Sequence, residues 1–265
     1  MNQPKGYKTV RSLVISLTFL LFFNGCIFLP VPEKKLNEEQ TKLKAIFELS
    51  DEKLYTKVID ECQEFLEVFP ESKYGDIGLL KLGEAYEGLL ATGYYQPVAK
   101  GAPEDETEKI FIEKHGHYQC WVETPCGLRY NLNAYKEMME RFPESLFADE
   151  AEYHLIPWLC AYEGLPEGPL QEIRDLENVL RKYPTTSLKG EIYYKIAYRF
   201  QILYEIFSFS SQMNLRDMDK AREYKEQARY AYQMALKFPI QTEYSKRAWK
   251  DLNNLEEGKR IYIME

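Results

Sequence analysis

The fold of this chain is decided by residues Leu54–Tyr86, which read LYTKVIDECQEFLEVFPESKYGDIGLLKLGEAY. In the first half of this stretch, apolar side chains recur every three or four residues, as on the buried face of an amphipathic helix. Pro70 ends that helix, because proline has no backbone N–H and disfavours the helical conformation at Phe69. A second amphipathic segment follows, with Gly83 where two helices would cross closely. The stretch therefore predicts two helices joined by a proline turn.

The proline turn recurs further along the chain, as FPES at Phe142–Ser145, YPTTS at Tyr183–Ser187 and FPIQT at Phe238–Thr242. Each copy lies between two amphipathic segments. The apolar face after the first turn matches the W-x2-L-G-x2-Y face of a tetratricopeptide repeat, and the face after the third turn has the same offsets. These faces consist of Leu79, Leu82, Gly83 and Tyr86, and of Tyr193, Ile196, Ala197 and Phe200. The turns lie further apart than the roughly 34 residues of such a repeat, so we expect two insertions.

These patterns predict an all-α protein, a tetratricopeptide-like α-solenoid of about five helix pairs over residues 36–265 with a long insertion at 92–130. We expect Ser50 to cap the second helix. Pro157 is expected to kink the first helix of the third pair or to start its second half. The charged last helix is expected to close the array as a polar cap. The expected helices span residues 36–49, 51–69, 73–91, 132–142, 147–162, 169–183, 188–207, 220–238 and 243–262.

Residues 1–25 have the pattern of a bacterial lipoprotein signal peptide. Basic residues precede the apolar run LVISLTFLLFF, which is shorter than the roughly 18–20 residues that span a bilayer. Gly25 and Cys26 resemble a lipobox, so we expect lipid attachment at Cys26 and a tether over residues 26–35. The alternative is an ordinary signal segment in which Cys26 is incidental. No aspartate follows Cys26, which favours the periplasmic face of the outer membrane as the location.

A lipoprotein-like beginning followed by helix pairs that end in FPES or YPTTS resembles the BamD family of outer-membrane assembly lipoproteins. The resemblance covers residues 26–262, apart from the insertions. It implies tetratricopeptide-like repeats and a protein that works by binding others. The implied partners are proteins of the β-barrel assembly machinery and unfolded segments of outer-membrane proteins. The alternative within the same class is a repeat lipoprotein of another envelope complex, such as a pilus, secretion or cell-wall machinery.

The insertion 92–130 is the segment most specific to this chain, because so long a loop in a compact domain is usually functional or disordered. Its IFIEKH run alternates, and we expect a strand or an extended arm there. Cys120 and Cys126 flank WVETP, and an oxidising periplasm permits a disulfide between them, with free thiols as the alternative. His115 and His117 could complete a zinc site with these cysteines, but H-x-H-x2-C-x5-C is no common zinc spacing. We therefore expect no metal.

Composition and motifs argue against several other functions. The formal net charge of −8 speaks against nucleic-acid binding, since phosphates would need a basic stripe. The sequence has no glycine-rich phosphate loop, no G-x-S-x-G motif and no H-E-x-x-H motif. We expect no enzyme, no catalytic residue and no cofactor; an enzyme or metal protein using residues 92–130 is the competing hypothesis. His154 and Trp158 are expected to be packing residues.

Overall fold

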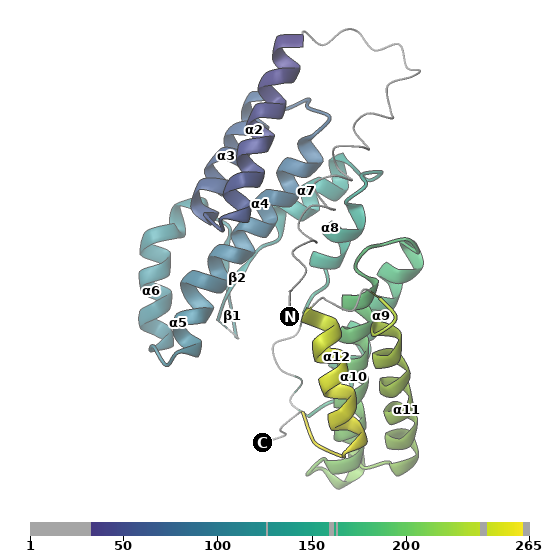
Figure 1. The fold of residues 1–265 in the computed structure, drawn as a ribbon. Helices are drawn as coiled ribbons and strands as arrows, with labels where there is room; N and C mark the ends of the chain where they lie inside the picture. Colours follow the sequence, from purple (N-terminus) through teal and green to yellow (C-terminus); the bar gives the residue numbers. More distant parts are fainter. Residues whose placement is uncertain (1–32, 126, 159–161, 163, 239–242, 262–265) are drawn as a thin grey trace, which may run out of the picture. The chain divides into compact units, whose positions relative to one another are not determined.

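The computed structural model describes residues 33–261, apart from 126, 159–161, 163 and 239–242. The described chain is mostly helical, and its strands form a two-stranded sheet (Figure 1). The chain divides into two compact units, Met1–Thr41 and Lys42–Glu265. The predicted signal peptide and Cys26 lie outside the described residues. Within the described ranges, no helix combines the length and the apolar character needed to cross a membrane.

The first helix, α2 (Glu33–Asp51), is longer than predicted at both ends. It includes the last residues of the predicted tether, and it continues through Ser50. The prediction that Ser50 caps the next helix is therefore wrong. Lys53 adopts a left-handed conformation with φ 58°, and the N–H of Leu54 donates to Leu49 O at 3.0 Å, which is how helices commonly end. The next helix, α3 (Tyr55–Val68), starts only after this turn.

The predicted first proline turn joins α3 to α4 (Gly75–Leu90). After Pro70, the Ser72 N–H donates to Phe69 O at 3.0 Å, and Ser72 Oγ accepts from the Tyr74 N–H at 3.1 Å. The second and third turns repeat this arrangement with Ser145 and Thr186. The hydroxyls of those two residues accept at 3.1 Å from the N–H groups of Phe147 and Leu188. The FPES-like sequence thus forms the same side-chain-supported turn each time.

The insertion is folded, and its IFIEKH run is helical rather than extended. It consists of a π-helical turn η1 (Ala91–Tyr95), α5 (Gln96–Ala99), α6 (Glu104–His115), a short η2 (Gly116–Tyr118) and the strands β1 (Trp121–Thr124) and β2 (Gly127–Tyr130). Acidic residues occupy the first turn of α6 and basic residues its last turn. These charges are opposite in sign to the two ends of the helix dipole and therefore stabilise the helix. Phe111 and His115, four residues apart, are buried, whereas Ile110 is 57% exposed. The strand prediction is therefore wrong, because the buried spacing is helical.

Aromatic side chains form the core under the insertion. The Tyr86 ring on α4 lies 5.7 Å from the rings of both Tyr118 and Trp121 and 4.9 Å from the Tyr130 ring. Phe111 lies 5.0 Å from Trp121, which also donates from Nε1 to His115 O at 2.8 Å. These contacts hold α6 and the hairpin against the end of α4.

Helix α7 (Asn133–Arg141) packs against α4 as the delayed partner predicted for it, and Figure 1 shows α3, α4 and α7 side by side. Gly83 lies where α4 crosses α7, and a Cβ added there would stand 2.5 Å from the Tyr135 ring. The prediction of a close crossing at Gly83 is confirmed. Helix α8 (Ala148–His154) ends before Pro157, so the predicted helix 147–162 is too long. The residue that precedes a proline is disfavoured in a helix, which explains the early end.

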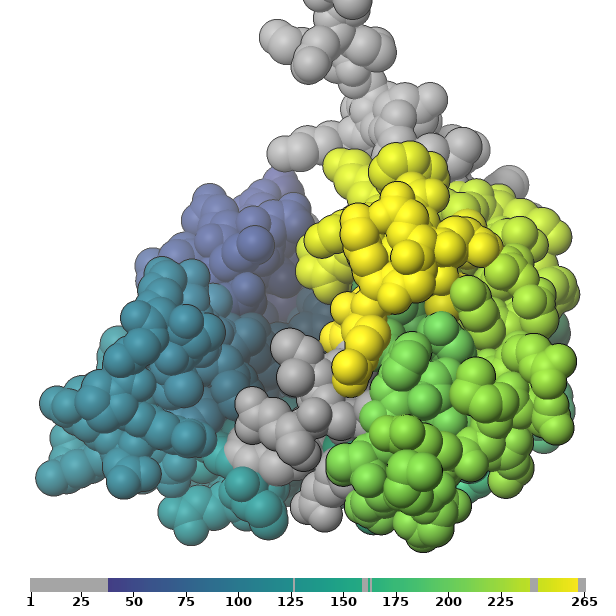
Figure 2. All heavy atoms as spheres, turned by 90° about the horizontal axis from the view of Figure 1, so that it is seen from below, coloured from purple at the N-terminus to yellow at the C-terminus, as the bar shows by residue number. Residues whose placement is uncertain are grey.

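The C-terminal part comprises α9 (Glu167–Lys182), α10 (Lys189–Phe209), a short η3 (Met213–Leu215), α11 (Met218–Ala235) and α12 (Glu243–Glu256). Helix α10 packs against α9 and α11, and α12 packs on α10 and α11. Figure 2 shows α12, in yellow, against the green α10 and α11. Helix α12 is shorter than predicted and is more than a polar cap, because Ala248 and Leu255 are fully buried. Small buried side chains let α11 approach α10 closely: Ala221, Ala228, Ala231 and Ala235.

Candidate functional site: a groove between α9 and α11

An open groove with a volume of about 570 Å³ runs over α10 between α9 and α11. The groove is open rather than enclosed, so it presents a surface to a partner and not a closed cavity for a small ligand. The groove exists because α10 packs on both neighbours and separates them. Its lining consists of Glu177 and Leu180 on α9, Tyr193, Ile196 and Phe200 on α10, and Glu226, Gln227, Tyr230 and Ala231 on α11.

The floor of the groove is one face of α10. Tyr193, Ile196 and Phe200 are three and four residues apart, so their side chains line up along the helix. The Tyr193 ring stacks on Phe238 with centroids 5.9 Å apart, and the Phe200 ring stacks on Tyr224 at 6.0 Å. These contacts fix the two aromatic rings, which makes the floor a preformed apolar surface.

The rim of the groove is acidic. Among its lining residues are two carboxylates, Glu177 and Glu226, and no cation. Glu226 forms an ion pair with Arg229, which lies beside the groove. The Glu177 carboxylate is exposed and makes no hydrogen bond or ion pair with a residue that the structure describes. Tyr230 on the opposite wall is 62% exposed. Tyrosine is common at protein interfaces, so this combination suits an apolar segment that carries a positive charge.

A buried ion pair holds α9 on α10 away from the groove. Arg199 Nε donates to Glu172 Oε2 at 2.7 Å, and the Glu172 side chain is only 1% exposed. The Tyr162 hydroxyl donates to the same carboxylate oxygen at 2.6 Å. A buried carboxylate with two donors is compensated, whereas loss of the cation would leave it costly. The pair therefore fixes the position of the groove floor relative to α9.

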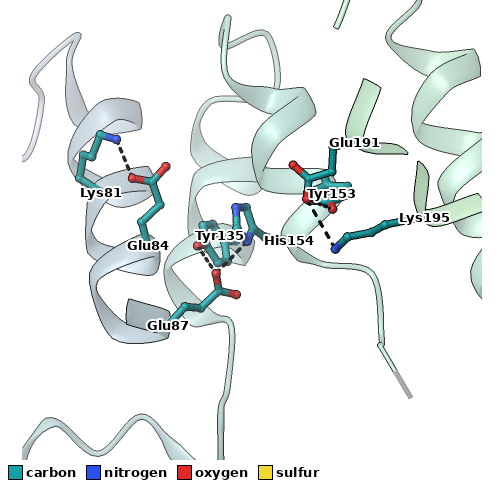
Figure 3. A network of polar contacts seen from close by, with 8 residues as sticks. All are labelled: Lys81, Glu84, Glu87, Tyr135, Tyr153, His154, Glu191 and Lys195. Atoms are coloured by element: carbon teal, nitrogen blue, oxygen red, sulfur yellow. Dashed lines mark hydrogen bonds and ion pairs between the residues drawn. The ribbon is translucent and has the colours of Figure 1, made fainter. Parts of the chain in front are cut away.

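A polar network crosses the helix contacts of α4, α7 and α8 (Figure 3). His154 Nδ1 lies 2.9 Å from Glu87 Oε2, and the Tyr135 hydroxyl donates to the same oxygen at 3.2 Å. The His154 and Tyr135 rings stack with centroids 4.6 Å apart. Burial lowers the pKa of His154, but the hydrogen bond to Glu87 and the charges of nearby glutamates outweigh it, so the pKa is raised overall. Protonated His154 therefore links α8 to α4.

A second polar cluster lies on α8 and α10, and Figure 3 shows most of it. The Tyr153 hydroxyl donates to Glu191, whose carboxylate lies 3.6 Å from the ammonium of Lys195. Lys195 Nζ also lies 4.2 Å from the centre of the Trp158 ring. Burial lowers the pKa of Lys195, although Glu191 opposes this. Burial raises the pKa of the two tyrosine hydroxyls drawn in Figure 3, Tyr135 and Tyr153, with Glu87 and Glu191 contributing, so both hydroxyls act as protonated donors.

The predicted site residues divide between described and undescribed positions. Cys26 and Cys126 lie outside the described residues. Cys120 is buried at the open end of the hairpin, and burial raises the pKa of its thiol to about 12. The disulfide stays a prediction, because Cys126 lies outside the described residues.

The histidines of the alternative zinc site point to different surroundings. His115 is buried against Phe111, while His117 is exposed with its ring 4.0 Å from the Tyr118 ring. Burial lowers the pKa of His115, aided by the charges of Lys114 and His117. In the described part of the chain, no group of three or more His, Cys, Asp or Glu side chains is arranged to hold a metal ion.

Sequence reasoning missed the open groove and the polar links. Tyr193, Ile196 and Phe200 pack into the core as expected, with Ile196 only 4% exposed, but they also form the floor of the groove. The sequence of α11 did carry a signal for the groove: Tyr230, a large aromatic residue, falls on the charged face of that helix. Glu87 and His154 carried no signal, because their pairing joins residues far apart in the sequence. The expectation that His154 and Trp158 pack against neighbours agrees with their ring contacts.

Comparison with known proteins finds no family model and no curated protein that matches this chain.

Proposed function

We propose that this protein is a lipid-anchored periplasmic scaffold that binds partner proteins through the groove between α9 and α11. The observation that carries the proposal is the preformed apolar floor of this groove under a rim of carboxylates. The groove lining holds no serine, cysteine or histidine, and one of its two carboxylates, Glu226, is paired with Arg229. Binding is the chemistry that such a lining supports best.

The proposal includes a tetratricopeptide-like array of about five helix pairs, similar to the BamD family. Its support is the side-chain-supported proline turn, which recurs with Ser72, Ser145 and Thr186 between consecutive helices. At each of these turns the helix that follows packs against the helix that precedes it: α4 against α3, α8 against α7 and α10 against α9. Helix pairs that pack in sequence order create the extended surfaces on which repeat proteins bind partners.

The proposed occupant of the groove is an apolar segment of a partner protein flanked by lysine or arginine. The apolar residues would lie on Tyr193, Ile196 and Phe200, and a basic residue would pair with Glu177. Attraction between the acidic rim of the groove and the basic residues of the partner would accelerate association and select the partner. The apolar contact with the groove floor would supply most of the affinity. In this proposal the partner belongs to the machinery that assembles outer-membrane β-barrel proteins, as the resemblance implies.

A photo-crosslinking residue at Tyr230 tests the proposal in intact cells. The matched control is the same residue at Trp249 on α12, since the two positions are 62% and 63% exposed. We expect adducts with components of the β-barrel assembly machinery from position 230 and not from position 249. Loss of these adducts in a Glu177→Lys background would confirm the charge requirement.

Two outcomes would contradict the proposal. Equal adducts from both positions would mean that the groove has no special role. Adducts from position 230 with proteins of a pilus, secretion or cell-wall complex would instead support the alternative of a repeat lipoprotein in another envelope machine.

A further inference from the structure

The hairpin in the insertion has two edges with different properties. The N–H of Asn131 donates to Cys120 O at 2.9 Å, which identifies these residues as a hydrogen-bonded pair. Hydrogen-bonded and non-hydrogen-bonded pairs alternate along an antiparallel ladder. In the observed register, Trp121 pairs with Tyr130 and Glu123 with Leu128, so both are non-hydrogen-bonded pairs. The backbone groups of Trp121 and Glu123 therefore point away from β2.

The outer edge of β2 is covered. Helices α4 and α6 pack against this strand, and the Tyr95 hydroxyl donates to Leu128 O at 2.7 Å. This hydrogen bond confirms that the Leu128 carbonyl points outward, as the alternation requires. Leu128 and Tyr130 are both buried. No further strand can add to β2 without displacing these contacts.

The outer edge of β1 is open by comparison. Among the residues that the structure describes, no partner hydrogen-bonds to the outward backbone groups of Trp121 and Glu123. Glu123 is exposed, and Val122 between them is 46% exposed. An open strand edge with an exposed apolar side chain is a template for adding another strand.

The surroundings of β1 are negatively charged. The Glu108 carboxyl on α6 lies close enough to the Glu123 carboxyl for the two to influence each other's titration. Burial raises the pKa of Glu108, with further contributions from Glu123, Glu104 and Asp105. A second copy of this chain would bring the same carboxylates to the edge and would be repelled. A segment with a basic residue would instead be attracted.

We propose that β1 binds an extended segment of a partner protein as a third strand, with a lysine or arginine of that segment beside Glu123. Partner residues opposite Trp121 and Glu123 would each exchange two backbone hydrogen bonds with β1, and the apolar side chain between them would lie beside Val122. Two such residue pairs make a weak contact. The edge therefore acts as a second, transient contact, and it is independent of the groove between α9 and α11.

The test is titration of the full chain with a short peptide of alternating threonine and valine that carries a central lysine, followed by amide NMR. We expect the largest shifts and the strongest protection from hydrogen exchange at Trp121 and Glu123. A peptide with a central glutamate tests the charge, and a peptide N-methylated on its pairing residues tests the backbone hydrogen bonds. Loss of the backbone pairing is expected to weaken binding at least about tenfold.

Variants of the protein complete the experiment. Glu123→Pro removes an outward N–H without touching the ladder to β2, so the hairpin is expected to persist and binding to be lost. Glu123→Gln should weaken binding of the lysine peptide several-fold, while Glu113→Gln on the exposed surface of α6 should not. Equal binding of the N-methylated peptide would overturn the proposal, even if Glu123→Pro disturbed the hairpin. Concentration-dependent protection of Trp121 and Glu123 without peptide would overturn it in favour of self-association.

Discussion

His154 makes a link between α8 and α4 that depends on its charge. Its pKa is raised in the folded protein above the ordinary value of about 6.5. The stabilisation is therefore fully present below pH 6.5 or so and is lost as the pH rises through the folded pKa. We expect His154→Gln to lower the urea midpoint more at pH 5.5 than at pH 8.5, relative to the parent protein.

His115 provides a control of opposite sign for this measurement. Burial lowers the pKa of His115 in the folded protein. As the pH falls through the pKa that His115 has in the unfolded chain, the unfolded chain takes up the proton first, and the folded protein loses stability. His115→Gln should accordingly cost less stability at pH 5.5 than at pH 8.5. If both variants showed the same pH dependence, the link between His154 and Glu87 would not control stability.

Gly83 permits the closest contact between α4 and α7. An alanine Cβ there would stand 2.5 Å from the Tyr135 ring. The helix-forming gain of alanine is smaller than the cost of this overlap, so we expect Gly83→Ala to destabilise the fold by roughly 1–2 kcal/mol. The measurement is equilibrium urea unfolding. Gly83→Ala combined with Tyr135→Leu should cost less than the sum of the two single variants; simple additivity would show that the crossing can relax.

At the scale of elements, the ion pair of Glu172 and Arg199 fastens α9 to α10. Removing the cation leaves a buried carboxylate, so Arg199→Met should destabilise the protein by about 3 kcal/mol. Changing Glu172→Gln in the same chain removes the uncompensated charge and should restore part of the loss. Urea unfolding of the single and double variants measures this. A double variant less stable than Arg199→Met alone would refute the assignment.

The element scale also shows what the sequence could predict. The apolar periodicity and the missing N–H of Pro70 predicted the two helices on either side of this proline. The small residue Gly83 within that periodic pattern predicted the close crossing. The IFIEKH run was mispredicted because two isoleucines with one residue between them imitate a strand, while the charges at the ends of α6 favour a helix. Nothing local predicted the pairing of Glu87 with His154, nor the groove that α9 and α11 leave over α10. Both depend on contacts between distant segments.

At the scale of the whole molecule, the proposed function makes Cys26 the residue through which the protein would be held in the cell envelope. Buried acyl chains contribute about 0.8 kcal/mol per methylene, enough to retain a soluble chain at a membrane surface. We expect the protein to incorporate a palmitate analogue when expressed with its own leader, and Cys26→Ser to abolish the incorporation. Intact mass should place the mature terminus at Cys26. Cys62→Ser, at a buried thiol of α3, is the control and should retain the label.

The π-helical turn at Ala91–Tyr95 joins α4 to α5 and holds one residue more than an α-helical turn. Because each residue rotates an α-helix by about 100°, this extra residue sets the angular phase of everything beyond it. Tyr94 thereby faces the interior, and Tyr95 reaches the carbonyl of Leu128. Shortening the turn by one residue would rotate both rings away. The length of a single helical turn thus governs whether Tyr94 and Tyr95 reach the insertion, whereas the contacts of Tyr86 with the hairpin are made before that turn.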